Sequence, residues 1–147
     1  MFNLKIKLAT AALVTAAGFA TPAIAGQCPT PGTNALANAP MMPKDVTDTV
    51  IASVDLGPEI GVGDRQLRTR RLVVQPGGIV PLHSHKDRPA LIYTLSGSIT
   101  EYSSTCAVPI EHTAGDISRE ADGLSHYWVN HGSVPTVLLS SDVHHGK

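Results

Sequence analysis

The sequence contains no run of basic residues and no long segment with helical periodicity. Its 147 residues carry 11 Lys and Arg against 12 Asp and Glu, a formal net charge of −1. Without a basic stripe, nucleic acid is not expected as a partner. Beyond the N-terminal segment no apolar run is long enough to span a bilayer, so no membrane span is expected in a mature chain. Hydrophobic side chains make up 42% of the residues, which excludes a disordered chain and fits one globular domain.

Residues 1–25 have the pattern of a secretory signal peptide. Residues 1–7 carry two lysines and no acid, and residues 8–20 are almost entirely apolar or small. The tripeptide Ala23-Ile24-Ala25 then offers the small side chains that signal peptidase accepts. We therefore expect cleavage after Ala25 and a periplasmic or secreted protein. The alternative is an uncleaved N-terminal anchor helix.

The two cysteines, Cys28 and Cys106, both remain after this cleavage. In an oxidising compartment an isolated pair is expected to form a disulfide. Such a bond would attach residues 26–45, an irregular N-terminal arm rich in Pro, Asn, Ala and Gly, to the body of the domain. The alternative is a thiol or thiolate metal site, which the lack of a C-x-x-C motif disfavours.

Residues 46–143 consist of short apolar or alternating runs separated by turns. Pro76-Gly77-Gly78 is expected to end a strand, and Ser96-Gly97 is expected to form a hairpin turn. The predicted strands cover residues 49–56, 66–75, 79–85, 90–95, 98–103, 124–130 and 136–140. This pattern predicts a single all-β domain, built as a sandwich or a barrel.

His83 and His85 are the first candidates for chemistry. They lie two residues apart on a predicted strand, so both imidazoles project from the same face. Two neutral imidazoles in this arrangement can bind one metal ion, at about 2 Å from each nitrogen. The pair alone is equally compatible with histidines that are solvated or hydrogen-bonded.

The residues around this pair resemble the two motifs of the cupin superfamily, G-x5-H-x-H-x3/4-E-x6-G and G-x5-P-x-G-x2-H-x3-N. The first motif is matched by Gly77, His83, His85 and Gly97, with Ala90 at the position of Glu. The second is matched by Gly115, Gly123, His126 and Asn130, with Ala121 at the position of Pro. The resemblance implies that residues 46–143 form a small jelly-roll β-barrel.

The resemblance also implies a metal site made by His83, His85 and His126, without the carboxylate that Ala90 replaces. The cofactor implied is a divalent transition metal: Fe, Cu, Zn, Mn or Ni. A site without an anionic ligand should favour an anionic substrate. The residues considered as a substitute for the carboxylate are Asp87, Glu101, Glu111 and His112, and none is favoured over the others.

Alternation along the predicted strands places further side chains near this site. If Ala90 and His126 face inward, so do Ile92, Thr94 and Trp128. The resulting pocket residues are Ala90, Ile92, Thr94, Glu101 and Trp128, although Trp128 could equally fill the core. Arg68 and Arg70 share one strand face, where they either bind an anion or form a charged outer surface.

The signal-peptide pattern and the resemblance together imply an exported metal-binding protein that acts on a small molecule. The resemblance leaves the reaction open, since related cupins include dioxygenases, isomerases and decarboxylases, and the three-histidine centre favours an oxygenase-type activity among them. The alternative function is a non-catalytic module that binds a metal or a small ligand. A third interpretation is a barrel whose histidines only pack or hydrogen-bond. A homodimer formed through barrel edges is implied by the resemblance alone.

Overall fold

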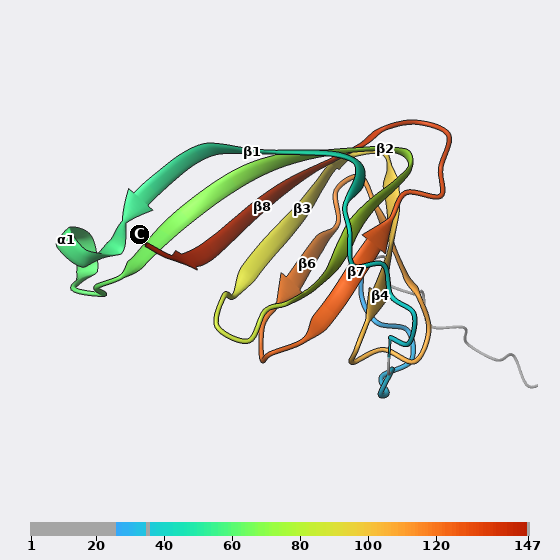
Figure 1. Ribbon diagram of the computed structural model, residues 1–147, viewed down its shortest axis with the longest axis horizontal. Helices are drawn as coiled ribbons and strands as arrows, with labels where there is room; N and C mark the ends of the chain where they lie inside the picture. The colour runs from blue at the N-terminus through green and yellow to red at the C-terminus, as the bar shows by residue number, and fades with distance from the viewer. Residues whose placement is uncertain (1–25, 35, 147) are drawn as a thin grey trace, which may run out of the picture.

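The computed structural model describes residues 26–34 and 36–146, which fold into one strongly bent β-sheet (Figure 1). The elements are β1 Lys44–Asp55, α1 Leu56–Ile60, β2 Arg65–Ser84, β3 Ala90–Ser96, β4 Ser98–Ser103, β5 Ile110–Thr113, β6 Ile117–Glu120, β7 Ser125–Val129 and β8 Thr136–His145. The proposed signal peptide, residues 1–25, lies outside the described residues. Within those residues, no helix has the length and apolar character that crossing a membrane requires.

The sheet curls into a nearly closed barrel in the order β5-β4-β7-β2-β8-β3-β6, with β1 added beside β2. The long strand β2 pairs with β1 and β8 along its first half and with β7 along its second half. Strands β3 and β4 follow each other in sequence but have different neighbours, β6 and β8 for β3, β5 and β7 for β4. The predicted all-β jelly roll is confirmed.

Two expected turns are corrected by this topology. The expectation that residues 76–78 end a strand is wrong, because β2 runs through them. Gly77, with a φ of +73°, bends the strand, and its N–H donates to the carbonyl of Asn130 at 2.8 Å. The Asn130 N–H donates in turn to the Gly78 carbonyl at 3.0 Å, so the ladder continues across the bend. The Ser96-Gly97 turn joins two strands that do not pair with each other, so it is not a hairpin.

The interior of the barrel is divided between an apolar cluster and a polar region. Seven buried apolar side chains form the cluster: Leu72, Val74, Ala90, Ile92, Ile99, Trp128 and Leu138. The buried polar side chains include His85, Glu101, His112, Glu120, His126 and Asp142. Burying so many ionisable groups is costly unless they are paired or bind a metal, so this region is where a functional site is expected.

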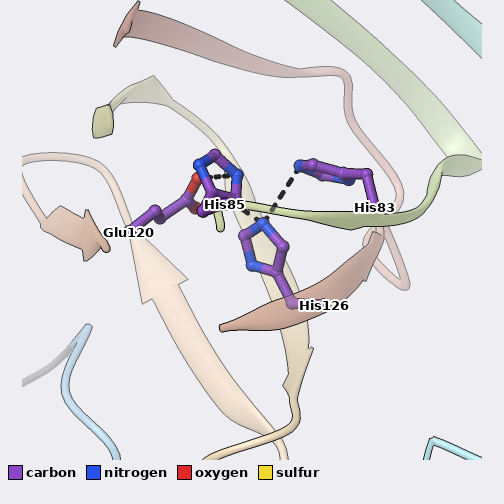
Figure 2. A group of neighbouring side chains, drawn as sticks. All are labelled: His83, His85, Glu120 and His126. Atoms are coloured by element: carbon purple, nitrogen blue, oxygen red, sulfur yellow. Dashed lines mark hydrogen bonds and ion pairs between the residues drawn. The ribbon is translucent and has the colours of Figure 1, made fainter. Parts of the chain in front are cut away.

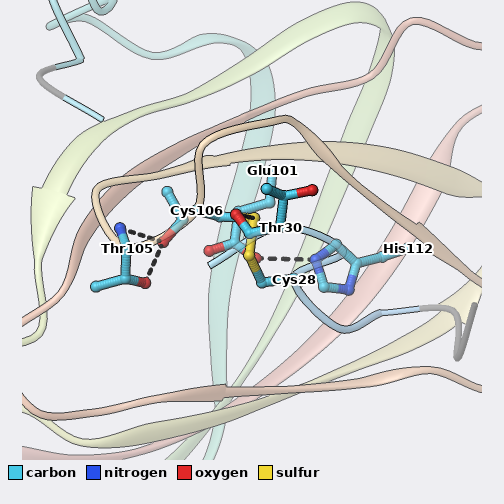
Figure 3. The surroundings of a disulfide bond; sticks show 7 residues. Cys28, Thr30, Glu101, Thr105, Cys106 and His112 are labelled. Atoms are coloured by element: carbon cyan, nitrogen blue, oxygen red, sulfur yellow. Dashed lines mark hydrogen bonds and ion pairs between the residues drawn. A yellow bond between two sulfur atoms is a disulfide. The ribbon is translucent and has the colours of Figure 1, made fainter. Parts of the chain in front are cut away.

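The predicted disulfide between Cys28 and Cys106 is confirmed (Figure 3). It joins the N-terminal arm to the segment that follows β4, across 78 residues of sequence. Backbone hydrogen bonds hold the arm along the same segment, from Gly32 to Thr105 and from Asn34 to Ser104, both at 3.1 Å. Figure 3 shows that Glu101 and His112 lie beside the disulfide, so the arm covers this part of the barrel.

The end of β8 is tied to two loops by an ion-paired histidine. His145 Nε2 lies 2.7 Å from Asp87 and His145 Nδ1 lies 3.2 Å from Asp64. The hydrogen bonds with Asp87 and Asp64 raise the pKa of His145 above its ordinary value. Because the folded state favours the charged imidazole, the stabilisation is present below the ordinary pKa and is lost as the pH rises through the raised pKa.

Replacing His145 with alanine should therefore lower the melting temperature more at about pH 5.5 than at about pH 8.5. The measurement is thermal denaturation of the metal-free wild type and the His145→Ala variant at both pH values. The effect should be small, since both partners are exposed. An equal difference at the two pH values would contradict the ion-pair assignment.

Candidate metal centre

Four side chains from separate parts of the sequence converge inside the barrel (Figure 2). They are His83 on β2, His85 just beyond the end of β2, Glu120 at the end of β6 and His126 on β7. One nitrogen or oxygen atom of each lies within 4.8 Å of the others. His83 and His126 are direct partners across the β2–β7 pair, which brings the two motifs together. This cluster could hold a metal ion.

Hydrogen bonds fix which ring nitrogen of each histidine carries the proton. For His83 and His85, Nδ1 faces a carbonyl oxygen that can only accept, so Nδ1 must be the donor and Nε2 keeps its lone pair. His126 Nδ1 has two neighbours, the Glu101 carboxylate at 2.8 Å and the Trp128 indole N–H at 3.1 Å, and we assign it as the donor to Glu101 because the charge-assisted hydrogen bond is the stronger of the two. The acceptors are the Pro81 carbonyl for His83, the Arg88 carbonyl for His85 and the Glu101 carboxylate for His126, each at 2.8 Å. Metal-binding histidines are commonly oriented in this way by their second nitrogen.

The four converging atoms are therefore acceptors that face one another. His83 Nε2 lies 3.1 Å from His126 Nε2, and His85 Nε2 lies 2.9 Å from a Glu120 oxygen. Among the described residues, His85 Nε2 and Glu120 Oε1 are buried without a hydrogen-bond partner. One proton could satisfy one facing pair, whereas a cation at the centre would satisfy all four groups. The donor set thus fits a divalent metal ion.

Burial also sets the charge state of the cluster. It lowers the pKa of His83 to about 3, and it lowers the pKa of His85 as well. It raises the pKa of Glu120 to about 7. The imidazoles of His83 and His85 are therefore neutral near neutral pH, which is the form that binds metals.

Glu120 is a residue that the sequence analysis missed, and it corrects the expectation of a cluster without a carboxylate. Ala90 and Glu120 are direct partners across the β3–β6 pair. The carboxylate that the first cupin motif carries at the position of Ala90 is thus supplied from the adjacent strand. The alternating burial of residues 117–120, with Ser118 and Glu120 buried, shows how the side chain faces inward.

The four substitutes considered from the sequence lie elsewhere. Asp87 pairs with Arg65 at the surface, and Glu111 accepts a hydrogen bond from Thr100. Glu101 and His112 lie behind His126, and neither belongs to the four-residue cluster.

Glu101 orients the metal-facing nitrogen of His126 from behind. Its Oε1 accepts from His126 Nδ1 at 2.8 Å, and its Oε2 lies 2.9 Å from His112 Nε2. The His112 ring stacks on Trp128 at a centroid distance of 4.5 Å. Burial raises the pKa of Glu101, but the hydrogen bonds from His112 and His126 outweigh it and hold the pKa at about 2. Glu101 therefore stays ionised and holds His126 in one tautomer.

Replacing Glu101 with glutamine should weaken metal binding about 10–100-fold, because His126 loses the anionic partner of its Nδ1. The measurement is competition for the metal against a chelator of known affinity. Glu111→Gln, on the neighbouring strand and exposed, is the matched control and should leave the affinity unchanged. Equal affinities in the two variants would contradict the orienting role of Glu101.

A cavity of about 200 Å³ adjoins the cluster and is lined by His83, His85 and Glu120 on that side. Of the pocket residues expected from the sequence, Ile92 and Trp128 line this cavity. Ala90, Thr94 and Glu101 are buried but do not line it.

Arg70 and Arg88 line the cavity, and together with Arg68 they surround one buried carboxylate behind it. The Asp142 side chain, fully buried, receives two hydrogen bonds from Arg68, at 3.0 and 2.9 Å, and one from Arg88 at 3.0 Å. Arg70 also lies within 3.5 Å of it. The interpretation of Arg68 and Arg70 as a charged outer face is therefore wrong, since their side chains are only 17% and 15% exposed.

A nearly closed antiparallel barrel with three histidines and a glutamate clustered inside defines a small jelly-roll protein with a candidate metal site. The family model described as "Cupin domain" matches residues 70–142. With both motifs and the barrel topology in agreement, this chain belongs to the cupin superfamily.

Curated relatives share about a third of their residues with this chain over a limited segment. Germin-like protein 1 of Brassica napus is 32% identical over 76 residues, which cover 50% of this chain and 37% of that protein. Auxin-binding protein ABP19b of Prunus persica is 31% identical over 84 residues, covering 55% of this chain and 40% of that protein. The chain thus spans about two fifths of the length of the curated relatives it matches.

Solved structures share the fold at lower sequence identity. A predicted oxalate decarboxylase from Thermotoga maritima superposes with a TM-score of 0.57 and 20% identity, over 78% of this chain and 92% of that one. An oxalate oxidase in complex with the substrate analogue glycolate gives a TM-score of 0.53 and 18% identity, over 69% and 52% of the two chains. At these identities the likeness establishes the fold alone.

Proposed function

We propose that this chain is an exported metal-binding cupin that acts on a small molecule through an oxygenase-type reaction. The proposal rests on one observation, the convergence of four acceptor groups, three of them buried, that one proton cannot satisfy together. His83, His85, Glu120 and His126 would hold the ion. Three nitrogens and one carboxylate oxygen are compatible with Fe, Mn, Zn, Cu or Ni. When bound, such an ion supplies Lewis-acid or redox chemistry at the mouth of the cavity.

The protein's own residues would hold and orient the reacting molecule. Trp128 and Ile92 form an apolar part of the cavity wall against which the body of a small molecule could pack. Glu101 keeps His126 in the tautomer that faces the ion. The names of the similar proteins support a small-molecule ligand, since they include an oxalate oxidase, a predicted oxalate decarboxylase and auxin-binding proteins.

A second candidate function is a non-catalytic module that binds a small ligand at the metal. One observation favours it: among the described residues that line the cavity, no acid or base stands free of a partner or of the cluster. Asp48 pairs with Arg70, and Glu120 belongs to the cluster.

Dioxygen uptake by the metal-loaded protein separates the two functions. An oxygen electrode would follow uptake with a panel of small organic acids, alcohols and phenols. The proposed activity predicts uptake with at least one compound and none with the His126→Ala variant. Full metal occupancy with no uptake, together with a ligand-dependent rise in melting temperature, would favour the binding module.

Export is part of the proposal and has its own test. A disulfide between Cys28 and Cys106 is compatible with an oxidising compartment. Mass spectrometry of the protein from the periplasmic or extracellular fraction should find an N-terminus at Gly26. A full-length chain retained in the cytoplasm would contradict export while leaving the metal site untouched.

A further inference from the structure

We propose that the cavity beside the cluster binds a small monocarboxylic acid with an apolar body, and that Arg88 receives the carboxylate. This inference rests on the proposed function, because it places the ligand next to the metal held by His83, His85, Glu120 and His126. It goes further by naming the chemical class of the ligand and the residue that selects it.

The apolar walls of the cavity define the body of the ligand. Besides the cluster residues, six apolar side chains line the cavity: Leu72, Val80, Pro81, Ile92, Trp128 and Leu138. They come from β2, β3, β7 and β8 and therefore surround the space on several sides. A polar group placed against them would lose its water without gaining a hydrogen bond. The volume of about 200 Å³ limits the ligand to a small molecule.

Arg88 is the residue that can bind the charged end. It lines the cavity from the loop between β2 and β3, and its side chain is 23% exposed. Among the described residues its one side-chain partner is Asp142, which accepts from Nη1 at 3.0 Å. A guanidinium group has five N–H donors, so Arg88 keeps donors for a ligand carboxylate. Arg70 also lines the cavity, but Asp48, Ser140 and Asp142 engage both of its terminal nitrogens, which leaves only its buried Nε without a partner.

The charge around Arg88 favours an anion. Three guanidinium groups, from Arg68, Arg70 and Arg88, share the carboxylates of Asp142 and Asp48. Arg68 donates two hydrogen bonds to Asp142, at 3.0 and 2.9 Å, whereas Arg88 donates only one. The Arg88 side chain is therefore held less tightly than that of Arg68. The wall therefore carries more positive than negative charge, and a carboxylate beside Arg88 would balance it.

Only one end of the ligand meets this polar wall. The Arg88 carbonyl accepts from His85 Nδ1, which holds the loop next to the cluster, and Arg88 lines the same cavity as His83, His85 and Glu120. A second carboxylate elsewhere in the cavity would face the six apolar side chains, or Arg70 and Ser140, which already bind each other. The geometry thus selects monocarboxylic acids with aliphatic or aromatic bodies over short dicarboxylic acids.

Calorimetric titration of the metal-loaded protein with acetate, propionate and butyrate tests the apolar wall. Each added methylene should tighten binding about fourfold, the effect of burying one such group. Succinate is the matched dicarboxylate and should bind at least tenfold more weakly than butyrate. Affinities that stay flat along the series, or succinate or oxalate binding as tightly as butyrate, would overturn the proposal.

The Arg88→Gln variant tests the charged contact. It should bind butyrate at least about tenfold more weakly, as expected for loss of a charge-assisted hydrogen bond. Its affinity for the neutral analogue butyramide and its metal content should not change. Arg119→Gln, which removes an exposed arginine paired with Asp122, is the control and should bind butyrate like the wild type. Equal butyrate affinity in both variants would overturn the role of Arg88.

The same preparations separate failure of this inference from failure of the proposed function. Wild-type protein that takes up no metal would overturn both. Wild-type protein that holds its metal but does not distinguish butyrate from succinate would overturn the ligand class alone.

Discussion

The Glu120→Ala variant should lose more than about 100-fold in metal affinity. This is a larger effect than we expect for Glu101, which does not contact the metal but orients the ligand His126. Glu120 brings the negative charge of the cluster, and its Oε2 lies 2.9 Å from His85 Nε2 and 3.5 Å from His126 Nε2. The measurement is competition with a chelator, with thermal denaturation to show that the variant is folded. Unchanged affinity in a folded variant would exclude Glu120 as a ligand.

Placing a carboxylate on β3, in the variant that lacks Glu120, should restore metal binding. Ala90 is the direct partner of Glu120, and strands in a pair lie about 4.8 Å apart, so a glutamate at position 90 can reach the same centre. In the sheet, Ala90 lies between Glu120 on β6 and Asp142 on β8. A glutamate at position 90 of the wild type would place three carboxylates side by side, so the substitution is made in a chain that lacks Glu120. The double variant Ala90→Glu/Glu120→Ala should recover at least tenfold of the lost affinity.

The matched control for this exchange is Ala90→Gln/Glu120→Ala, which has the same shape but no charge. It should bind metal no better than Glu120→Ala alone. Recovery in the glutamine variant as well would show that packing, and not the carboxylate, governs the affinity. Recovery in neither would show that position 90 does not reach the cluster.

Removing the disulfide should have the largest effect on stability. The bond closes a loop with a sequence separation of 78 residues, for which the chain-entropy model gives about 4 kcal/mol. The Cys28→Ala/Cys106→Ala variant should accordingly melt roughly 15 °C below the wild type when both are free of metal. The measurement is thermal and urea denaturation of both proteins.

Reduced wild type is the control for the disulfide prediction, and it should melt close to the double variant. The arm also covers the region of Glu101 and His112 (Figure 3), so its release should expose the groups behind His126. A loss of less than about 1 kcal/mol would show that backbone hydrogen bonds, such as that from Gly32 to Thr105, hold the arm without the disulfide.

The histidines of the site were predictable from the sequence, whereas its carboxylate was not. His83 and His85 are separated by one residue, so local spacing identifies this pair, and the resemblance to the second cupin motif adds His126. Glu120 enters the cluster because β6 pairs with β3, a contact between segments 30 residues apart that local spacing does not reveal. Its position just before the Ala121-Asp122-Gly123 turn and its alternation with Ser118 were the available indications.

The fold class was predictable for a similar reason, and the strand pairing was not. Residues 98–103 form a strand with the predicted bounds, because alternation and flanking turns are local properties. The partners of a strand depend on the whole barrel: the residues on either side of Ser96-Gly97 lie in β3 and β4, which do not pair. At residues 76–78 the hydrogen bonds with Asn130 carry the ladder through a sequence that usually ends a strand.

Elemental analysis of the protein, after loading with a divalent transition metal and removal of excess ion, measures whether the four side chains bind a metal. We expect about one equivalent of metal per chain in the wild type and almost none in a folded His126→Ala variant. A wild type that retains no metal, or a variant that retains as much as the wild type, would contradict a metal site formed by these four side chains.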